Sequence, residues 1–224
     1  MERQEGVVTS VERQKKQRQR YNVFVDEQFA FAVHEDVLMK YRLFKGQVVT
    51  ADRLADIVRD EERQDAYTKV VKWLGGGLRS EKEIRGYLSR KGYEEDTVDA
   101  CVERLRAQSY VDDERLSRTL AEDRLKLQSK GKQWIRRELL QKGVDKSTVQ
   151  EAVGSIDAGE EAAAALAVAR KRWRTLGAGD DPAAAKRKLY AYLARRGFSA
   201  GAVREAVRQT ASGADGSDDE WDWE

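Results

Sequence analysis

The sequence predicts a mainly α-helical protein of three tandem three-helix repeats in an elongated body, with a small N-terminal element that contains a β-hairpin. The main observation is a pattern repeated around Gly92, Gly143 and Gly197, which lie 51 and 54 residues apart. In each copy, apolar residues stand eight and four positions before the glycine, a lysine or arginine precedes it directly, and valines follow six and ten positions later. Spacings of four place these residues on one helix face, and a cation followed by glycine is typical of a helix end. Each copy therefore predicts a helix, a tight glycine turn and a second helix.

The distance between the glycines leaves room for a third helix before each pair, and we predict these helices at residues 66–74, 112–128 and 159–176. Such units bury their apolar faces by stacking, which creates an extended surface and favours binding over catalysis. We expect an N-terminal β element with linking helices over residues 1–60. The repeats are predicted at 61–110, 111–157 and 158–211, followed by a disordered acidic tail at 212–224.

The N-terminal residues differ from the rest because they are β-prone. Residues 6–11 predict one strand, and the runs 21–25 and 29–33 flank the turn residues 26–28 as in a hairpin. The intervening segment RQKKQRQR, residues 13–20, has five bases and no acid. It is either a solvated loop or a strand that touches phosphates. Its candidate phosphate contacts are Lys15, Lys16, Arg18 and Arg20.

Further helices are predicted over residues 34–42 and from residue 50 onward, and several helix starts are marked by polar residues. Two pairs match the capping-box pattern, namely Ser80 with Glu83 and Ser147 with Gln150. Asp181 before Pro182 predicts an N-cap followed by a proline in the first turn. Asp112 and Asp113 also fit a helix cap, and this interpretation is favoured over a catalytic carboxylate pair because no second acidic cluster or histidine partners them.

Residues for common catalytic and metal sites are scarce in this chain. His34 is the only histidine and Cys101 the only cysteine, so Ser-His-Asp triads, multi-histidine sites and cysteine clusters are excluded. Cys101 falls on an apolar helical stripe and is expected to be buried. We therefore expect no enzyme activity and no cofactor or metal. Without a membrane-spanning run or signal-peptide pattern, we expect a cytoplasmic protein, and a monomer.

The net charge of +2 hides an uneven distribution. Residues 212–224 hold six acids and no base, so the remainder carries about +8. A basic body suggests an anionic partner, with nucleic acid the commonest, although a solvated surface accounts for the same numbers. The acidic tail either shields the basic body or aids solubility.

The candidate contact residues are basic side chains of the second and third repeats. They are Lys130, Lys132, Arg136, Arg137 and Lys142 in the second repeat, and Arg170, Arg172, Arg174, Lys186, Arg187, Arg195 and Arg196 in the third. Such residues neutralise phosphates, and nearby aromatic residues can stack on unpaired bases. However, Trp173 and Tyr190 also stand at spacings expected for core residues.

Four segments resemble the RecX family, the regulators of the RecA recombinase. They are SEKEIRGYLSRKGY at residues 80–93, YVDDERLSR at 110–118, GKQWIRRELLQKGV at 131–144 and RYNVFVDEQFAFAV at 20–33. Their order makes the resemblance specific. Two positions depart from the family, since members often have an aromatic residue in place of Leu116 and an arginine in place of Trp134.

The resemblance implies tandem three-helix repeats that bind along the groove of a RecA filament on single-stranded DNA. It implies modulation, usually inhibition, of ATP hydrolysis, strand exchange and co-protease activity. The basic residues would then contact single-stranded DNA directly or the RecA surface. Two other functions remain open: a stand-alone helix-turn-helix DNA-binding regulator and a helical scaffold that binds only protein.

Overall fold

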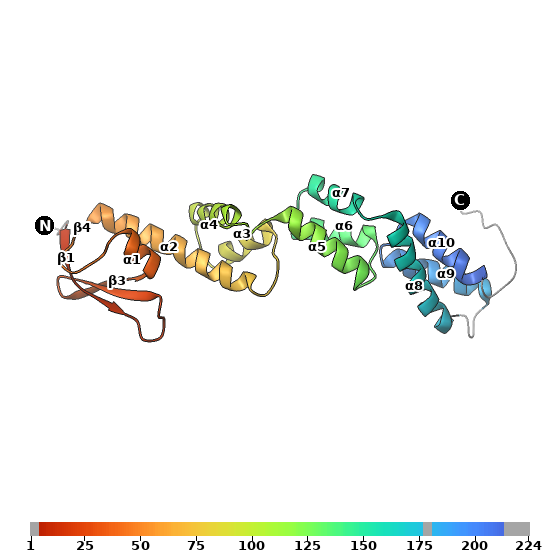
Figure 1. Cartoon of the computed structure of the whole chain (residues 1–224), viewed down its shortest axis with the longest axis horizontal. Helices are drawn as coiled ribbons and strands as arrows, with labels where there is room; N and C mark the ends of the chain where they lie inside the picture. Colours follow the sequence, from red (N-terminus) through yellow and green to blue (C-terminus); the bar gives the residue numbers. More distant parts are fainter. Residues whose placement is uncertain (1–4, 177–180, 213–224) are drawn as a thin grey trace. The chain divides into compact units, whose positions relative to one another are not determined.

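The structure is a computed structural model that describes residues 5–176 and 181–212 (Figure 1). The chain divides into two compact units, one ending at Val111 and the other beginning at Asp112. Of the predicted acidic tail, Ser212 is the last residue of a helix, and residues 213–224 lie outside the described residues.

The first unit begins with a four-stranded antiparallel sheet in the order β3-β2-β1-β4. The strands are β1 (Glu5–Arg13), β2 (Arg20–Val25), β3 (Gln28–His34) and β4 (Val48–Thr50). The predicted hairpin is β2 and β3, and its turn residues Asp26 and Glu27 both have positive φ, 47° and 66°, as a two-residue hairpin turn requires. Val8, Val23 and Val33 point from the sheet into a small core, which helix α1 (Glu35–Lys40) also contacts.

Helix α2 (Ala51–Leu74) belongs to two cores at once. Ile57 packs with the sheet, whereas Ala66 and Val70 pack in the first repeat. The boundary expected between residues 60 and 61 thus falls inside one continuous helix. Gln64 ties the two parts together, because its amide nitrogen donates to Asp36 Oδ2 at 3.0 Å and its oxygen accepts from Arg104 Nη1 at 2.6 Å.

The first repeat combines the second half of α2 with α3 (Glu81–Arg90) and α4 (Glu95–Ala107). The predicted capping box of Ser80 and Glu83 is confirmed: the Ser80 hydroxyl accepts from Glu83 N at 3.2 Å, and Ser80 N donates to Glu83 Oε2 at 2.9 Å. The apolar residues of the glycine pattern, Ile84, Leu88, Val98 and Val102, lie in the core.

The second unit contains the other two repeats. The second repeat is α5 (Asp113–Lys126), α6 (Lys132–Lys142) and α7 (Lys146–Gly154), and the third is α8 (Ala158–Leu176), α9 (Pro182–Arg195) and α10 (Ala200–Ser212). Each repeat has its own apolar core, to which its glycine-pattern residues contribute. The expected architecture of three three-helix repeats preceded by a small β element is therefore confirmed.

The three reference glycines have the left-handed backbone conformation that the sequence pattern predicts. The φ angles are 87° at Gly92, 84° at Gly143 and 82° at Gly197. In each turn the N–H of the residue after the glycine donates to the carbonyl of the leucine four positions before the glycine, as Val144 N does to Leu139 O at 3.2 Å. This bond satisfies a carbonyl at the helix end while the chain reverses direction.

One predicted cap is wrong. Helix α7 is capped by Asp145 rather than by Ser147, because Asp145 Oδ1 accepts from Ser147 N at 2.9 Å and from Thr148 N at 3.0 Å. The Ser147 and Thr148 hydroxyls donate to the same carboxylate, and these hydrogen bonds hold the pKa of Asp145 well below its usual range. Asp112 and Asp181 cap α5 and α9 as predicted.

The second and third repeats are joined through the start of α6. Glu161 is 2% exposed, and its Oε1 accepts from Lys132 N and from Ser199 N, both at 3.0 Å. Gly131 N donates to Arg196 O at 3.0 Å, and Gln133 N donates to Gly197 O at 2.8 Å. The free N–H groups at the start of α6, which has no side-chain cap of its own, are thereby satisfied by the third repeat.

We predict that alanine at Gly197 destabilises the fold far more than alanine at Gly92. Both glycines have positive φ, which costs a residue with a Cβ about 1–2 kcal/mol. A Cβ at Gly92 would meet nothing within 4 Å, whereas at Gly197 it would lie 2.3 Å from Trp134 N. Urea unfolding followed by circular dichroism should show a small loss for Gly92→Ala and a loss of roughly 3 kcal/mol or more for Gly197→Ala. Equal losses would contradict the close packing of α6 on the third repeat.

Candidate nucleic-acid interface

The positive charge of the chain is concentrated in the third repeat. Residues 158–212 hold eleven lysines and arginines against five aspartates and glutamates. Residues 111–157 hold ten against nine, and residues 61–110 hold ten of each. An anion approaching the third repeat therefore meets a surplus of cations that the other repeats lack.

The last two turns of α8 carry the densest cluster. Arg170, Lys171, Arg172 and Arg174 are all exposed, and none of them pairs with a carboxylate of the described residues. The Arg172 guanidinium lies 5.3 Å from the centre of the Tyr192 ring on α9, so it is directed toward that helix. Cations here also interact favourably with the C-terminal end of α8. We call these four residues the α8 cluster.

Helix α9 adds Arg187 and Arg195, which are likewise exposed and without a carboxylate partner among the described residues. Lys186 is half-buried and engaged in an interaction within the protein. In the second repeat, Arg136 and Arg137 are exposed on α6, and Arg137 Nε donates to Gln133 O at 3.3 Å. These arginines can reach a partner without breaking an ion pair.

Other predicted contacts of the second repeat are less accessible. Lys130 is half-buried, with its ammonium 4.5 Å from the centre of the Trp134 ring. Lys142 is half-buried in the last turn of α6 and has an interaction within the protein. Both remain candidates, but their exposed area is smaller than that of Arg136 and Arg137.

Lys132 and Arg196 have structural roles. Lys132 Nζ donates to Ile156 O at 2.6 Å, and Arg196 donates through Nη2 to Gln128 O at 2.6 Å and through Nε to Ser129 O at 3.0 Å. The hydrogen bonds from Lys132 and Arg196 to these backbone carbonyls therefore hold adjacent elements of the second unit together. Sequence spacing could not reveal this, because Arg196 and its acceptors lie more than sixty residues apart. We remove both residues from the proposed contact set.

At the N-terminus, Lys15, Lys16 and Arg18 are exposed in the loop between β1 and β2. Arg20 differs, because its guanidinium lies 2.7 Å from Glu61 Oε1 on α2, and Glu61 Oε2 in turn accepts from His34 N at 2.6 Å. This ion pair fastens the hairpin to α2, so Arg20 also leaves the proposed contact set. The lone histidine caps α1, with Nδ1 accepting from Asp36 N at 3.2 Å.

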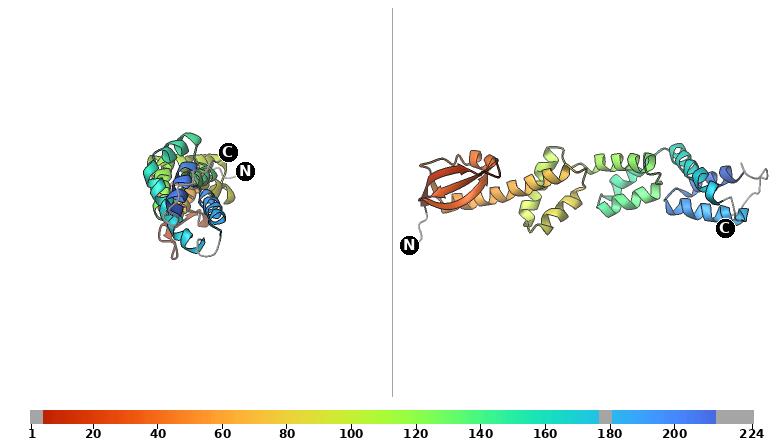
Figure 2. Two further views of the ribbon diagram at one scale, coloured as in Figure 1. Left: turned by 90° about the vertical axis from the view of Figure 1, so that its right-hand side faces the viewer. Right: turned by 90° about the horizontal axis from the view of Figure 1, so that it is seen from below.

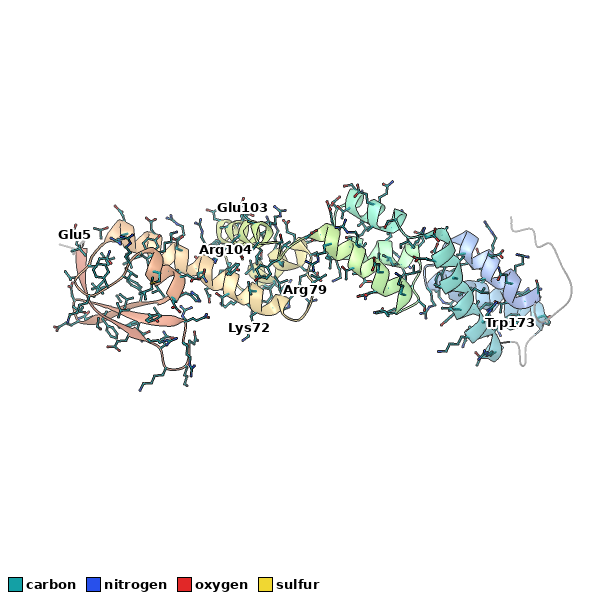
Figure 3. All side chains as sticks on the ribbon, in the orientation of Figure 1. Glu5, Lys72, Arg79, Glu103, Arg104 and Trp173 are labelled. Carbon is teal, nitrogen blue, oxygen red and sulfur yellow. The ribbon has the colours of Figure 1, made fainter. Side chains whose placement is uncertain are left out.

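The aromatic residues of the third repeat belong mainly to the core. Trp173, near the C-terminal end of α8 (Figure 3), and Tyr190 are half-buried against the third-repeat core. Tyr192 is also half-buried, and the guanidinium groups of Arg172 and Arg196 lie 5.3 and 5.7 Å from its ring centre. The Tyr192 ring is therefore already in contact with two of the protein's own cations.

An aromatic stack in the first repeat was missed in the sequence analysis. The Trp73 and Tyr87 rings are stacked with centroids 4.5 Å apart, the Arg79 guanidinium lies 4.9 Å from the Trp73 ring, and the Lys91 ammonium lies 5.8 Å from the Tyr87 ring. Arg79 is labelled in Figure 3. Trp73 lies in the last turn of α2, Arg79 lies in the following loop, and Tyr87 and Lys91 belong to α3 and its C-cap, so the tertiary fold brings the two rings together. The stack stabilises the first repeat.

The residues with catalytic potential occupy structural positions. Asp112 Oδ1 accepts from Arg115 N at 2.8 Å, as a helix cap does. Cys101 is buried in the first core, and burial raises the pKa of its thiol to about 11. Within the described ranges, no group of three or more histidine, cysteine, aspartate or glutamate residues is arranged to hold a metal ion. No helix in those ranges is long and apolar enough to cross a bilayer.

Fold and surface together define a tandem three-helix-repeat protein with a sheet-containing N-terminal element and a cationic third repeat. Four sequence models of RecX domains match it in order: the regulatory protein RecX N-terminal domain at residues 6–50, and the first, second and third three-helix domains at 66–105, 112–153 and 159–207. The chain belongs to the RecX family.

Two relatives show how far the similarity extends. The regulatory protein RecX of Clostridium botulinum (strain Eklund 17B / Type B) is 30% identical over 90% of this chain and 95% of its own length. That of Clostridium acetobutylicum is 30% identical over 92% of this chain and 97% of its own length. Family members thus carry the name of regulatory proteins, and the similarity covers nearly the whole chain.

Solved structures have the same fold. A crystal structure of a regulatory protein RecX superposes with a TM-score of 0.75 at 27% identity, covering 91% of this chain and 99% of that one. The RecX structure from Lactobacillus salivarius gives a TM-score of 0.63 at 18% identity, over 67% of this chain and 97% of that one, and at this identity shows the fold alone.

We predict that Arg196→Ala lowers the stability of the second unit, while Arg187→Ala does not. Loss of the Arg196 guanidinium removes the two hydrogen bonds that it donates to the carbonyls of Gln128 and Ser129, which together should cost about 1–3 kcal/mol. Arg187 is exposed and should change stability by less than about 0.5 kcal/mol. Urea unfolding of the two variants measures the difference. Equal stability would contradict the structural role of Arg196.

Proposed function

We propose that this protein inhibits a RecA recombinase by binding along the groove of the RecA filament on single-stranded DNA, thereby lowering ATP hydrolysis, strand exchange and co-protease activity. Membership in a family of proteins named as regulators supports a regulatory role. The structural observation that carries the proposal is the set of exposed arginines on α8 and α9, for which the described residues provide no carboxylate partner. Such arginines can contact DNA phosphates or an acidic RecA surface.

The joined second and third repeats suit binding to a repeating partner. Glu161 and the backbone hydrogen bonds at Gly131 and Gln133 hold the two repeats together before any partner binds. Contacts from Arg136 on α6 and Arg170 on α8 are therefore presented by one pre-organised body, which reduces the entropy lost on binding. A body that bridges several RecA subunits would favour one filament state over another, which is a shift of population without a chemical step.

We place the protein in the cytoplasm as a monomer that acts without a cofactor. The exposed loop residues Lys15, Lys16 and Arg18 supply a second phosphate contact in the first unit. The function proposed here uses binding alone.

Charge reversal at four arginines tests the placement. We expect Arg136→Glu, Arg137→Glu, Arg170→Glu and Arg172→Glu together to weaken inhibition of single-stranded-DNA-dependent ATP hydrolysis by RecA at least about tenfold, because attraction becomes repulsion. The measurement adds substoichiometric protein to preformed filaments and records the amount needed for half-maximal inhibition. Weakening should be accompanied by loss of co-sedimentation with the filaments.

A control variant distinguishes the effect of these four positions from the effect of the changed net charge. It carries Lys45→Glu, Arg90→Glu, Arg115→Glu and Lys126→Glu, which alter four exposed cations elsewhere and give the same net charge. This control should inhibit nearly as well as the unaltered protein. Undiminished inhibition by the first variant would exclude these arginines as the filament contact. Sequence-specific duplex binding without RecA would instead support a stand-alone helix-turn-helix regulator.

A further inference from the structure

The α8 cluster lies at the end of the third repeat at which α10 also ends. Helices α8 and α10 start side by side, because Glu161 near the start of α8 accepts from Ser199 N, directly before α10. Their small residues then face each other in the third core, with Ala165 and Ala169 on α8 and Ala206 on α10. Figures 1 and 2 show both helices running to the same end of the repeat.

The C-terminal ends of α8 and α10 lie at a similar level, because the two helices start side by side and rise by the same distance per residue. Trp173 follows Glu161 by twelve residues, and Ser212 follows Ala200 by twelve residues. At 1.5 Å per residue, each helix advances roughly 18 Å over this span. Ser212, the last residue of α10, therefore lies at about the level of the α8 cluster. The twelve residues that follow reach at most about 40 Å when extended, so the cluster is well within their range.

The charges of the two segments are complementary. Six acids lie among residues 213–224, as Asp215, Asp218, Asp219, Glu220, Asp222 and Glu224. The α8 cluster places four exposed cations within five residues, without carboxylate partners among the described residues. Single exposed ion pairs contribute little, but several of them on a short tether act at an effective concentration in the millimolar range.

The C-terminal segment also shares its chemistry with single-stranded DNA. Its last five residues, EWDWE, alternate carboxylates with Trp221 and Trp223, whereas DNA alternates phosphates with bases. The guanidinium of Arg172 already lies over the Tyr192 ring, so the cluster combines charge with contacts to aromatic faces. Arginine surfaces of this kind bind both anions and flat rings.

We propose that residues 213–224 occupy the α8 cluster in the free protein and that an anionic nucleic-acid partner must displace them. The segment is an intramolecular competitor, which lowers the affinity for nucleic acid until a partner offers more contacts. The inference rests on the proposed function only in that this face binds an anionic strand.

The test uses the full chain with its six C-terminal acids replaced by amides, Asp→Asn and Glu→Gln. Binding of a fluorescent oligothymidine of about 20 nucleotides is measured by anisotropy at low salt. We expect the amide variant to bind about five- to tenfold more tightly than the unaltered chain, with a smaller difference at higher salt because the competing contacts are screened.

Two triple variants test whether the gain arises at the α8 cluster or from net charge. Both have the same charge: Arg170→Ala, Arg172→Ala and Arg174→Ala remove three of the four cations of the α8 cluster, while Arg115→Ala, Arg118→Ala and Lys126→Ala remove three exposed cations of α5. Amidation should still tighten binding five- to tenfold in the α5 variant but less than twofold in the cluster variant. Equal gains in both would mean that the acids act only through net charge and would overturn the inference.

Two further outcomes are distinguishable. Unchanged oligothymidine binding after amidation, with altered binding to RecA filaments, would show that the segment contacts RecA and would also overturn the inference. If neither the unaltered chain nor the amide variant bound the oligonucleotide or the filament, the proposed function itself would fail.

Discussion

The left-handed glycine after the second helix of each repeat is the constraint on which the fold depends. Gly92, Gly143 and Gly197 have nearly the same φ, and at each of them the chain reverses between two helices of about three turns. A helix pair this short is marginal in water, so each repeat is stable only when the reversal brings the two apolar stripes onto a third helix. At Gly197 the same turn also supplies a carbonyl to the start of α6. The turn within the third repeat thus also forms part of its attachment to the second repeat.

Features that depend on a few neighbouring residues could be predicted from the sequence, and features that depend on distant contacts could not. The glycine turns, the β2–β3 hairpin and the capping box at Ser80 follow from local backbone preferences. The cap of α7 was misassigned because Asp145 and Ser147 both fit the local pattern and compete for the same N–H groups. The candidate contacts were predicted in the second and third repeats, but only the third has a clear surplus of lysine and arginine over aspartate and glutamate. Composition could not distinguish the exposed Arg187 from Arg196, whose acceptors come from the preceding repeat.

The cations of the first unit and those of the third repeat differ in whether they form ion pairs within the protein. In the first unit many cations are neutralised internally, for example Arg85, which lies 2.8 Å from Glu81 and 2.5 Å from Asp99. In the third repeat the cations of the α8 cluster have no carboxylate partner among the described residues. These unpaired cations do not stabilise the fold, because like charges repel one another. Even an exposed ion pair would contribute only about 0–1 kcal/mol. In the proposed function, the partner supplies the negative charge that these cations lack.

The continuous α2 helix has a mechanical consequence. Because Ile57 is fixed in the sheet core and Val70 in the first-repeat core, with Gln64 bonded to both sides between them, no flexible joint separates the two parts. A rotation of the β element is therefore passed directly to the first repeat, because no linker lies between them to absorb it. The β element can therefore orient the first repeat on a partner, and a ligand held by the loop at Lys15 would steer both together.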